Sequence, residues 1–150
     1  MPTEHPRPEP VDPDVDLHVP AQRQELARTH GGVLAVIALG GGLGGLARYG
    51  VGLLVPGVWA TLAVNVVGGA LLGVLMVLIT EKWRAHPLAR PFLGVGVLGG
   101  FTTFSTYTND FRHLLVPGGV PDAFAYLVLT LVAAVGATAL AVALTRRAVA

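Results

Sequence analysis

Residues 58–80, VWATLAVNVVGGALLGVLMVLIT, decide the fold of this chain. They contain no charged residue, and a helix needs roughly 20 apolar residues to cross the hydrocarbon core of a bilayer. Because lipid offers no hydrogen bonds, only helices and closed barrels satisfy their backbone there. Barrel strands would show short segments of alternating hydrophobicity, whereas this run is continuous. The segment is therefore predicted to be a membrane-spanning helix.

Working outward from this segment, four stretches of the chain lack charge: Gly31–Ala47, Tyr49–Thr80, Pro91–Asn109 and Ala123–Thr145. The second stretch is too long for a single crossing, and it contains the turn signal Val-Pro-Gly at residues 55–57. Dividing it there gives four predicted helices, at about 33–54, 58–80, 91–114 and 123–145. The expected fold class is an all-α membrane protein with four transmembrane helices.

The composition supports a membrane protein and argues against an enzyme. Of the 150 residues 53% are hydrophobic and 13% charged, the mean hydropathy is +0.65, and there is no cysteine. Disulfides and thiolate metal sites are therefore excluded. Asp110 is the only carboxylate in the four predicted helices, the five histidines lie in the tail and loops, and no nucleophile–base pair or phosphate-binding loop appears.

Residues 1–30 differ from the rest of the chain. They hold six of the 11 prolines and six of the nine acidic residues, with little apolar surface. Such a composition predicts a disordered tail. It is not expected to be a signal peptide, because it is acidic and the hydrophobic segment after it has spanning length. A four-helix membrane domain is thus expected at residues 31–150.

The first predicted helix contains glycines four residues apart, at 40 and 44 and at 41 and 45. Glycines at this spacing line a helix face on which another helix can approach closely. Arg48 lies toward the far end of the same helix. Its guanidinium could reach the membrane interface, or it could line an aqueous vestibule that attracts anions.

Asn65 is the only amide among more than twenty apolar residues of the second helix, and it shares a helix face with Thr61 and Gly68. Such an asparagine can join two helices by hydrogen bonds, or it can donate its NH₂ group to a permeating anion. Both interpretations remain open. In the fourth helix Tyr126, Thr130, Ala134 and Thr138 recur every four residues, a polar stripe that is weak evidence alone.

The third helix contains the most informative stretch. Of residues 102–109, TTFSTYTN, only Phe104 lacks a hydrogen-bonding group. Thr102 follows Pro91 by eleven residues, which places it roughly 17 Å along a helix and near mid-membrane. Hydroxyls preceded by two glycines at that depth predict a helix broken near 99–106, whose free backbone groups line a cavity or hold an ion. The alternative is a buried, hydroxyl-rich packing seam.

Three motifs together resemble those of the CrcB/Fluc family of fluoride channels. They are Gly44-Gly45-Leu-Ala-Arg48-Tyr49, Thr61-Leu-Ala-Val-Asn65-Val-Val-Gly68, and Gly99-Gly100-Phe-Thr102-Thr103-Phe104-Ser105-Thr106-Tyr107. The resemblance covers about residues 33–145, and its third motif is highly specific. It implies an antiparallel dimer of four-helix subunits in the cell membrane, surrounded by lipid. It also implies a structural Na⁺, not transported, that is held by the backbone carbonyls of Gly99 and Thr102.

The same resemblance implies a function and a pore. The chain would let cytoplasmic fluoride leave the cell passively and so reduce fluoride toxicity. Asn65, Phe104 and Tyr107 would line the pore, with Tyr126 and Thr130 as a polar track and Arg48 at a vestibule. Fluoride holds its water tightly, so amide and hydroxyl donors and the positive edges of aromatic rings must replace that hydration.

Two departures from the family's pattern stand out. Tyr107 occupies the place of a second pore phenylalanine, and its hydroxyl could alter or obstruct one pore. Asp110 replaces the family's usual glutamate. Two other functions therefore stay open: a non-conducting partner subunit that completes another chain's pore, or a small membrane transporter unrelated to fluoride.

The distribution of basic residues predicts the orientation of the chain. With four crossings, both termini and the 81–90 loop share one face. Eight basic residues lie on that face: Arg7, Arg23, Arg28, Lys82, Arg84, Arg90, Arg146 and Arg147. At most Arg48 and Arg112 lie on the other. Basic flanks stay inside the cell, so both termini are predicted to be cytoplasmic. This bias favours pairing with an oppositely oriented paralogous subunit, the alternative being an antiparallel homodimer of this chain.

Overall fold

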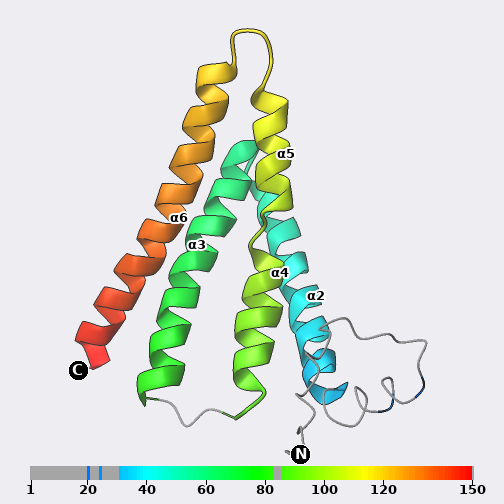
Figure 1. Ribbon diagram of the computed structural model, residues 1–150, viewed down its shortest axis with the longest axis vertical. Helices are drawn as coiled ribbons and strands as arrows, with labels where there is room; N and C mark the ends of the chain where they lie inside the picture. Colours follow the sequence, from blue (N-terminus) through cyan, green and yellow to red (C-terminus); the bar gives the residue numbers. More distant parts are fainter. Residues whose placement is uncertain (1–19, 21–23, 25–30, 83–85, 150) are drawn as a thin grey trace, which may run out of the picture. The chain divides into compact units, whose positions relative to one another are not determined.

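The structure is a computed structural model that describes residues 20, 24, 31–82 and 86–149. The tail predicted to be disordered, 1–30, therefore lies almost wholly outside the described residues. Residues 33–150 form one compact unit, and the description below concerns that unit. Its elements are α2 (Gly31–Leu54), α3 (Val58–Val77), η1 (Leu78–Lys82), η2 (Pro91–Leu98), α4 (Gly99–Phe101), α5 (Ser105–Leu114) and α6 (Val120–Val149), where η marks a π-helix (Figure 1).

Three of the helices are long and apolar enough to cross a membrane: Gly31–Leu54, Val58–Lys82 and Val120–Val149. These agree with the first, second and fourth predicted helices. The third predicted helix, 91–114, begins and ends where the sequence indicated, but it is divided among η2, α4 and α5. Because no single helix there reaches spanning length, a count of four crossings remains a prediction.

The predicted turn between the first two helices is present. Gly57 has a φ of 60°. Glycine adopts this left-handed region without strain, whereas other residues are strained there. α2 therefore ends at Leu54 and α3 begins at Val58, as the Val-Pro-Gly signal indicated.

The glycine face of α2 packs directly on the backbone of η2 and α4. A Cβ atom on Gly40 would lie 2.5 Å from the Phe92 carbonyl oxygen, and one on Gly100 would clash with the backbone of Gly41. Gly44 similarly contacts the Val97 carbonyl and the Phe101 amide. The prediction of close helix approach is confirmed at Gly40, Gly41 and Gly44, whereas a Cβ on Gly45 would meet nothing within 4 Å. α2 is thus held against the first half of the divided segment.

α3 packs against α6 along most of its length, and Figure 1 shows the two helices side by side. At Gly73 the backbone of α6 comes so near that a Cβ would lie 2.6 Å from the Thr138 carbonyl oxygen. The Thr138 hydroxyl itself donates to the Ala134 carbonyl of its own helix, at 2.9 Å. The second half of the polar stripe on α6, Ala134 and Thr138, is thus a packing seam.

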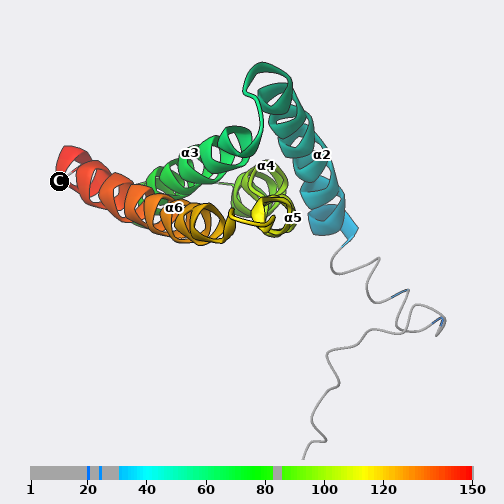
Figure 2. The same ribbon diagram turned by 90° about the horizontal axis from the view of Figure 1, so that it is seen from above.

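The helix break lies within the range that the sequence indicated. α4 ends at Phe101, Thr102 is extended with φ −76° and ψ 161°, and α5 begins at Ser105. Viewed along the bundle in Figure 2, α4 and α5 overlap, whereas Figure 1 shows α5 above α4. The two half-helices therefore stand nearly end to end, and the break separates them. Gly68 on α3 faces it, in contact with the Thr102 methyl group.

Candidate functional site

Asn65 of α3 is hydrogen-bonded to the backbone at the break. Its Oδ1 accepts from the Thr103 amide at 2.8 Å, and its Nδ2 donates to the Thr103 carbonyl at 3.0 Å. The side chain thus replaces the helical partners that Thr103 lacks, which is how irregular backbone is tolerated inside a bundle. One of its two N–H groups makes the bond to the carbonyl, and the second remains available. Of the two interpretations of Asn65, the joining of two helices is what the geometry shows.

The break leaves backbone carbonyls without their helical donors. The Thr103 amide, which would otherwise reach Gly99, is bonded to Asn65. The Thr106 amide, which would otherwise reach Thr102, is bonded to the Thr103 hydroxyl at 3.1 Å. Within residues 31–82 and 86–149 the carbonyl oxygens of Gly99 and Thr102 accept none of the backbone hydrogen bonds that lie outside the helices.

Free carbonyl oxygens are hard ligands that suit Na⁺, so these two residues fit the ion that the sequence resemblance implies. Gly99 is also solvent-exposed in the single chain, and a Cβ there would meet only the Gly94 carbonyl oxygen, at 4.0 Å. No group of three or more histidine, cysteine or acidic side chains gathers in the described part of the chain. A cation held at the break would therefore depend on backbone oxygen atoms.

Arg48 of α2 lies on another side of the same break. Its Nε donates to the Gly100 carbonyl at 3.1 Å, so the arginine takes up a third carbonyl that the break sets free. It also lines a cavity of about 490 Å³. The other lining residues are Gly45, Tyr49, Gly52, Leu53, Ala60, Thr61, Val64, Thr103 and Thr106. A guanidinium facing a cavity of this size is compatible with the vestibule role that the resemblance implies.

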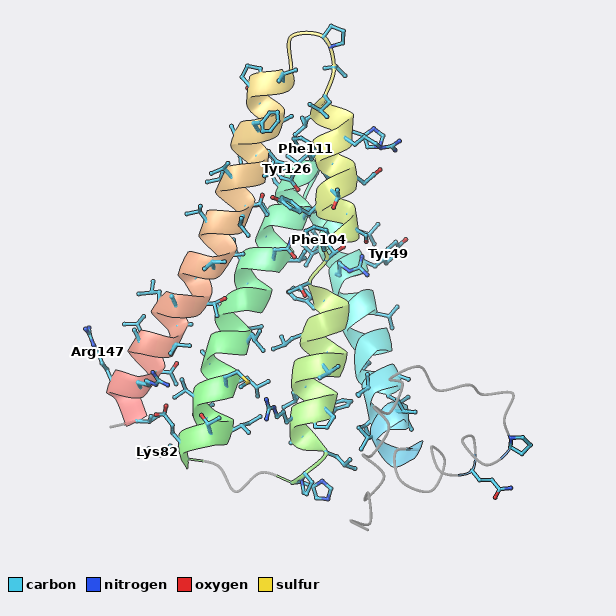
Figure 3. The ribbon with its side chains drawn as sticks, in the orientation of Figure 1. Tyr49, Lys82, Phe104, Phe111, Tyr126 and Arg147 are labelled. Carbon is cyan, nitrogen blue, oxygen red and sulfur yellow. The ribbon has the colours of Figure 1, made fainter. Side chains whose placement is uncertain are left out.

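Three aromatic rings extend from the break toward α6. Phe104, just before α5, is 77% exposed, and its ring centroid lies 5.8 Å from that of Tyr107. Tyr107 is 9% exposed, and its ring lies 5.7 Å from that of Tyr126 on α6, tilted by 49°. Figure 3 shows Phe104 where α4 gives way to α5, and Tyr126 nearer the α5–α6 loop. The structure thus brings together three of the predicted pore residues.

A buried group of hydroxyls gathers around Asp110. The Thr61 hydroxyl donates to its Oδ2 at 2.6 Å, and the Tyr126 hydroxyl donates to the same oxygen at 3.2 Å. The Thr130 hydroxyl, from a residue only 3% exposed, has no hydrogen-bond partner in the part of the chain described. Tyr126, one of the two residues of the predicted polar track, is thus joined to Asp110 of α5, while Thr130 lies buried one turn further along α6.

Sequence reasoning gave little weight to Asp110 and did not foresee this contact. The available signal was that no other acidic residue lies within the four predicted helices, which makes an intramembrane carboxylate a functional candidate by default. Thr61 was recognised only as a member of the Asn65 helix face. Its partner could not be read from spacing along its own helix.

The assembled site has both hydrogen-bond acceptors, with negative partial charge, and donors, with positive partial charge, within a short length of chain. Free carbonyls end the helix before the break, while amide and hydroxyl donors follow it. Discontinuous helices inside an apolar bundle are how channels and transporters build ion sites near mid-membrane. The fold and the site therefore define the chain as a membrane protein of the ion-conducting or transporting kind.

Comparison with known proteins is consistent with this class. The model of the family described as "CrcB-like protein, Camphor Resistance (CrcB)" matches residues 35–142. Fluoride-specific ion channel FluC 2 of Streptomyces avermitilis is 51% identical over 132 residues, 84% of each chain. FluC 1 of Streptomyces coelicolor is 52% identical over 125 residues, 80% of this chain and 81% of that one. FluC 3 of S. avermitilis is 45% identical over 129 residues, 83% of this chain and 63% of that one.

This chain belongs to the CrcB-like family, a family of multi-pass membrane proteins whose curated relatives carry the name of fluoride-specific ion channels. The identification made from the three sequence motifs is confirmed.

Proposed function

We propose that this chain is a subunit of a fluoride-specific ion channel that lets cytoplasmic fluoride leave the cell passively. The observation that carries the proposal is the broken helix at Thr102–Phe104, held open by Asn65, in a chain whose relatives are named for this activity. Neutral HF enters a cell through lipid and dissociates there. A passive anion channel then lets the negative membrane potential drive fluoride outward.

The residues at the break suit the chemistry of fluoride. A small anion that holds its water tightly must receive hydrogen bonds in return for lost hydration. The second N–H of Asn65 and the unpartnered Thr130 hydroxyl can donate, and the exposed edge of the Phe104 ring carries positive partial charge. Chloride is larger and less strongly hydrated, so it gains less from such short-range donors.

Fluoride release from liposomes tests this function. Protein reconstituted into vesicles loaded with fluoride should release it when valinomycin and K⁺ compensate the charge, and an electrode follows the release. Vesicles loaded with chloride are the matched control. Equal release of the two anions would contradict a fluoride-specific channel, and so would release no faster than from empty vesicles when every partner subunit is present.

The proposed architecture is an antiparallel dimer in which each chain crosses the membrane four times. The third crossing would consist of η2, α4 and α5 together. A structural Na⁺ would be held by the Gly99 and Thr102 carbonyls of both subunits, where the chain leaves them without helical donors. The exposure of Gly99 in the single chain supports this arrangement, because a second subunit can then approach the break.

The proposed orientation places both termini in the cytoplasm, and the partner is an oppositely oriented paralogue. The support is the asymmetry of basic residues, eight on one face and at most two on the other. S. avermitilis carries two relatives that are both named fluoride-specific ion channels, so one genome can encode more than one such chain. Reporters active only inside or only outside the cell, fused to the C-terminus, test the orientation. Comparable signal from both would favour the homodimer.

A second candidate function is a non-conducting subunit that completes the pore of its partner. The observation that favours it is Tyr107, since the hydroxyl could obstruct the pore that this chain lines. Fluoride release from this chain purified alone and from the purified pair of paralogues separates the two candidates. Release that requires the partner and survives Phe104→Ile in this chain would favour the non-conducting role.

A further inference from the structure

The hydroxyl of Tyr107 has a defined partner that the pore role does not explain. It donates to the Leu127 backbone carbonyl of α6 at 2.6 Å, a short bond for a hydroxyl donor, and the residue is 9% exposed. Leu127 follows Tyr126, which donates in the opposite direction, from α6 to Asp110 of α5. The two buried tyrosines therefore tie α5 to α6 by reciprocal hydrogen bonds.

We propose that Tyr107 is a positioning residue: its hydroxyl ties the first turn of α5 to α6, and so fixes the break and the adjoining Phe104 ring. The proposal deepens the proposed function and rests on it. It also implies that this chain's pore conducts, because the oxygen that distinguishes tyrosine from phenylalanine is bonded to the α6 backbone.

Three observations carry the proposal. A hydroxyl has a single proton, so once it donates to Leu127 it has none left to offer an anion. The Tyr107 ring lies between two others, with centroids 5.8 Å from Phe104 and 5.7 Å from Tyr126, so its rotation would displace both. Finally, α5 has ten residues and an end freed by the break, so it needs a tertiary contact to hold its position.

The variant Tyr107→Phe tests the proposal, because it removes the hydroxyl and keeps the ring. We expect fluoride release per assembled channel to fall on the order of three- to tenfold, the effect of losing one hydrogen bond. The amides of residues 105–108 should exchange hydrogen faster in nanodiscs. Thr80→Val is the matched control: it also removes a hydroxyl bonded to a carbonyl, that of Met76, but it lies in η1, beyond the C-terminal end of α3.

The measurements separate positioning from general destabilisation. A merely less stable fold would lower the yield of assembled protein and leave the release per channel unchanged, which would overturn the proposal. Faster fluoride release from Tyr107→Phe would also overturn it, because the hydroxyl would then be an obstruction. Unchanged hydrogen exchange at residues 105–108 would show that the tie does not hold α5. If the unaltered protein releases no fluoride but the variant exchanges faster, the tie stands and the proposed function fails.

Discussion

Replacing Asn65 by Asp removes one hydrogen-bond donor and changes the shape of the side chain very little. The carboxylate can still accept from the Thr103 amide, now 2.8 Å from Oδ1, but it cannot donate to the Thr103 carbonyl, now 3.0 Å from Nδ2. Leaving a buried acceptor unpaired costs about 1–3 kcal/mol, and the Thr103 carbonyl, which is partly buried, should lie toward the lower end of that range. At 1.4 kcal/mol for each factor of ten, the equilibrium ratio of the intact break to opened forms should fall about five- to 150-fold.

The new negative charge adds a second penalty, because it stands beside the proposed path of an anion. We therefore expect Asn65→Asp to reduce fluoride release per assembled channel by at least tenfold. The assay is liposome efflux at equal amounts of assembled protein, together with the melting temperature of each variant. Asn65→Leu is the informative comparison, because it removes the acceptor as well and should assemble less well than Asn65→Asp. Release from Asn65→Asp within twofold of the unaltered protein would refute the reasoning and leave Asn65 outside the site.

Further predictions concern the residues around the break. Phe104→Ile should reduce fluoride release at least tenfold with little change in melting temperature, because the lost ring is 77% exposed; normal release would remove it from the pore. Thr102→Ser should bind Na⁺ and assemble normally. Gly99→Val should fold, since a Cβ there has room within its own chain, but it should fail to pair with a second subunit. Intact dimers of Gly99→Val in light scattering would contradict this. Gly68→Val should destabilise the chain by about 1–3 kcal/mol, because the new side chain would meet the Thr102 methyl group. Gly136→Ala should not, because a Cβ at Gly136 has open space around it. Equal melting temperatures of the two variants would disprove the difference.

Much of the fold could be predicted because the bilayer restricts what a chain can do. Uncharged runs of spanning length have few alternatives to helices, and Gly57 marked the turn that divides the longest run. The glycines of α2 indicated a close helix contact, which the structure shows at Gly40. The divided third segment also followed from its residues, because a cluster of hydroxyls at mid-membrane depth is costly in an unbroken, lipid-facing helix.

The partners of individual side chains could not be predicted. Spacing placed Asn65 on a helix face, but it could not say whether the amide joins two helices or faces an ion. The same limit explains Arg48, whose bond to the Gly100 carbonyl depends on where another element happens to end its helix. The polar residues of α6 recur every four residues along one face, but that face meets different neighbours along its length. Tyr126 therefore lies in the hydroxyl cluster, while Thr138 lies in a packing seam. The spacing of polar residues shows which of them share a helix face, but the element that packs on that face determines what each residue contacts.

The two sides of the break are held by different kinds of force, and this has a consequence for motion. Before the break, backbone lies against backbone at Gly40, Gly44 and Gly100, where a small displacement in either direction meets a steric barrier or opens a void. After the break, α5 is held by side-chain hydrogen bonds and by the contact of the Tyr107 and Tyr126 rings, and the hydrogen bonds can exchange one partner for another without opening a gap. Fluctuations on the timescale of ion passage should therefore concentrate in α5, with α4 as the stationary reference against which they occur.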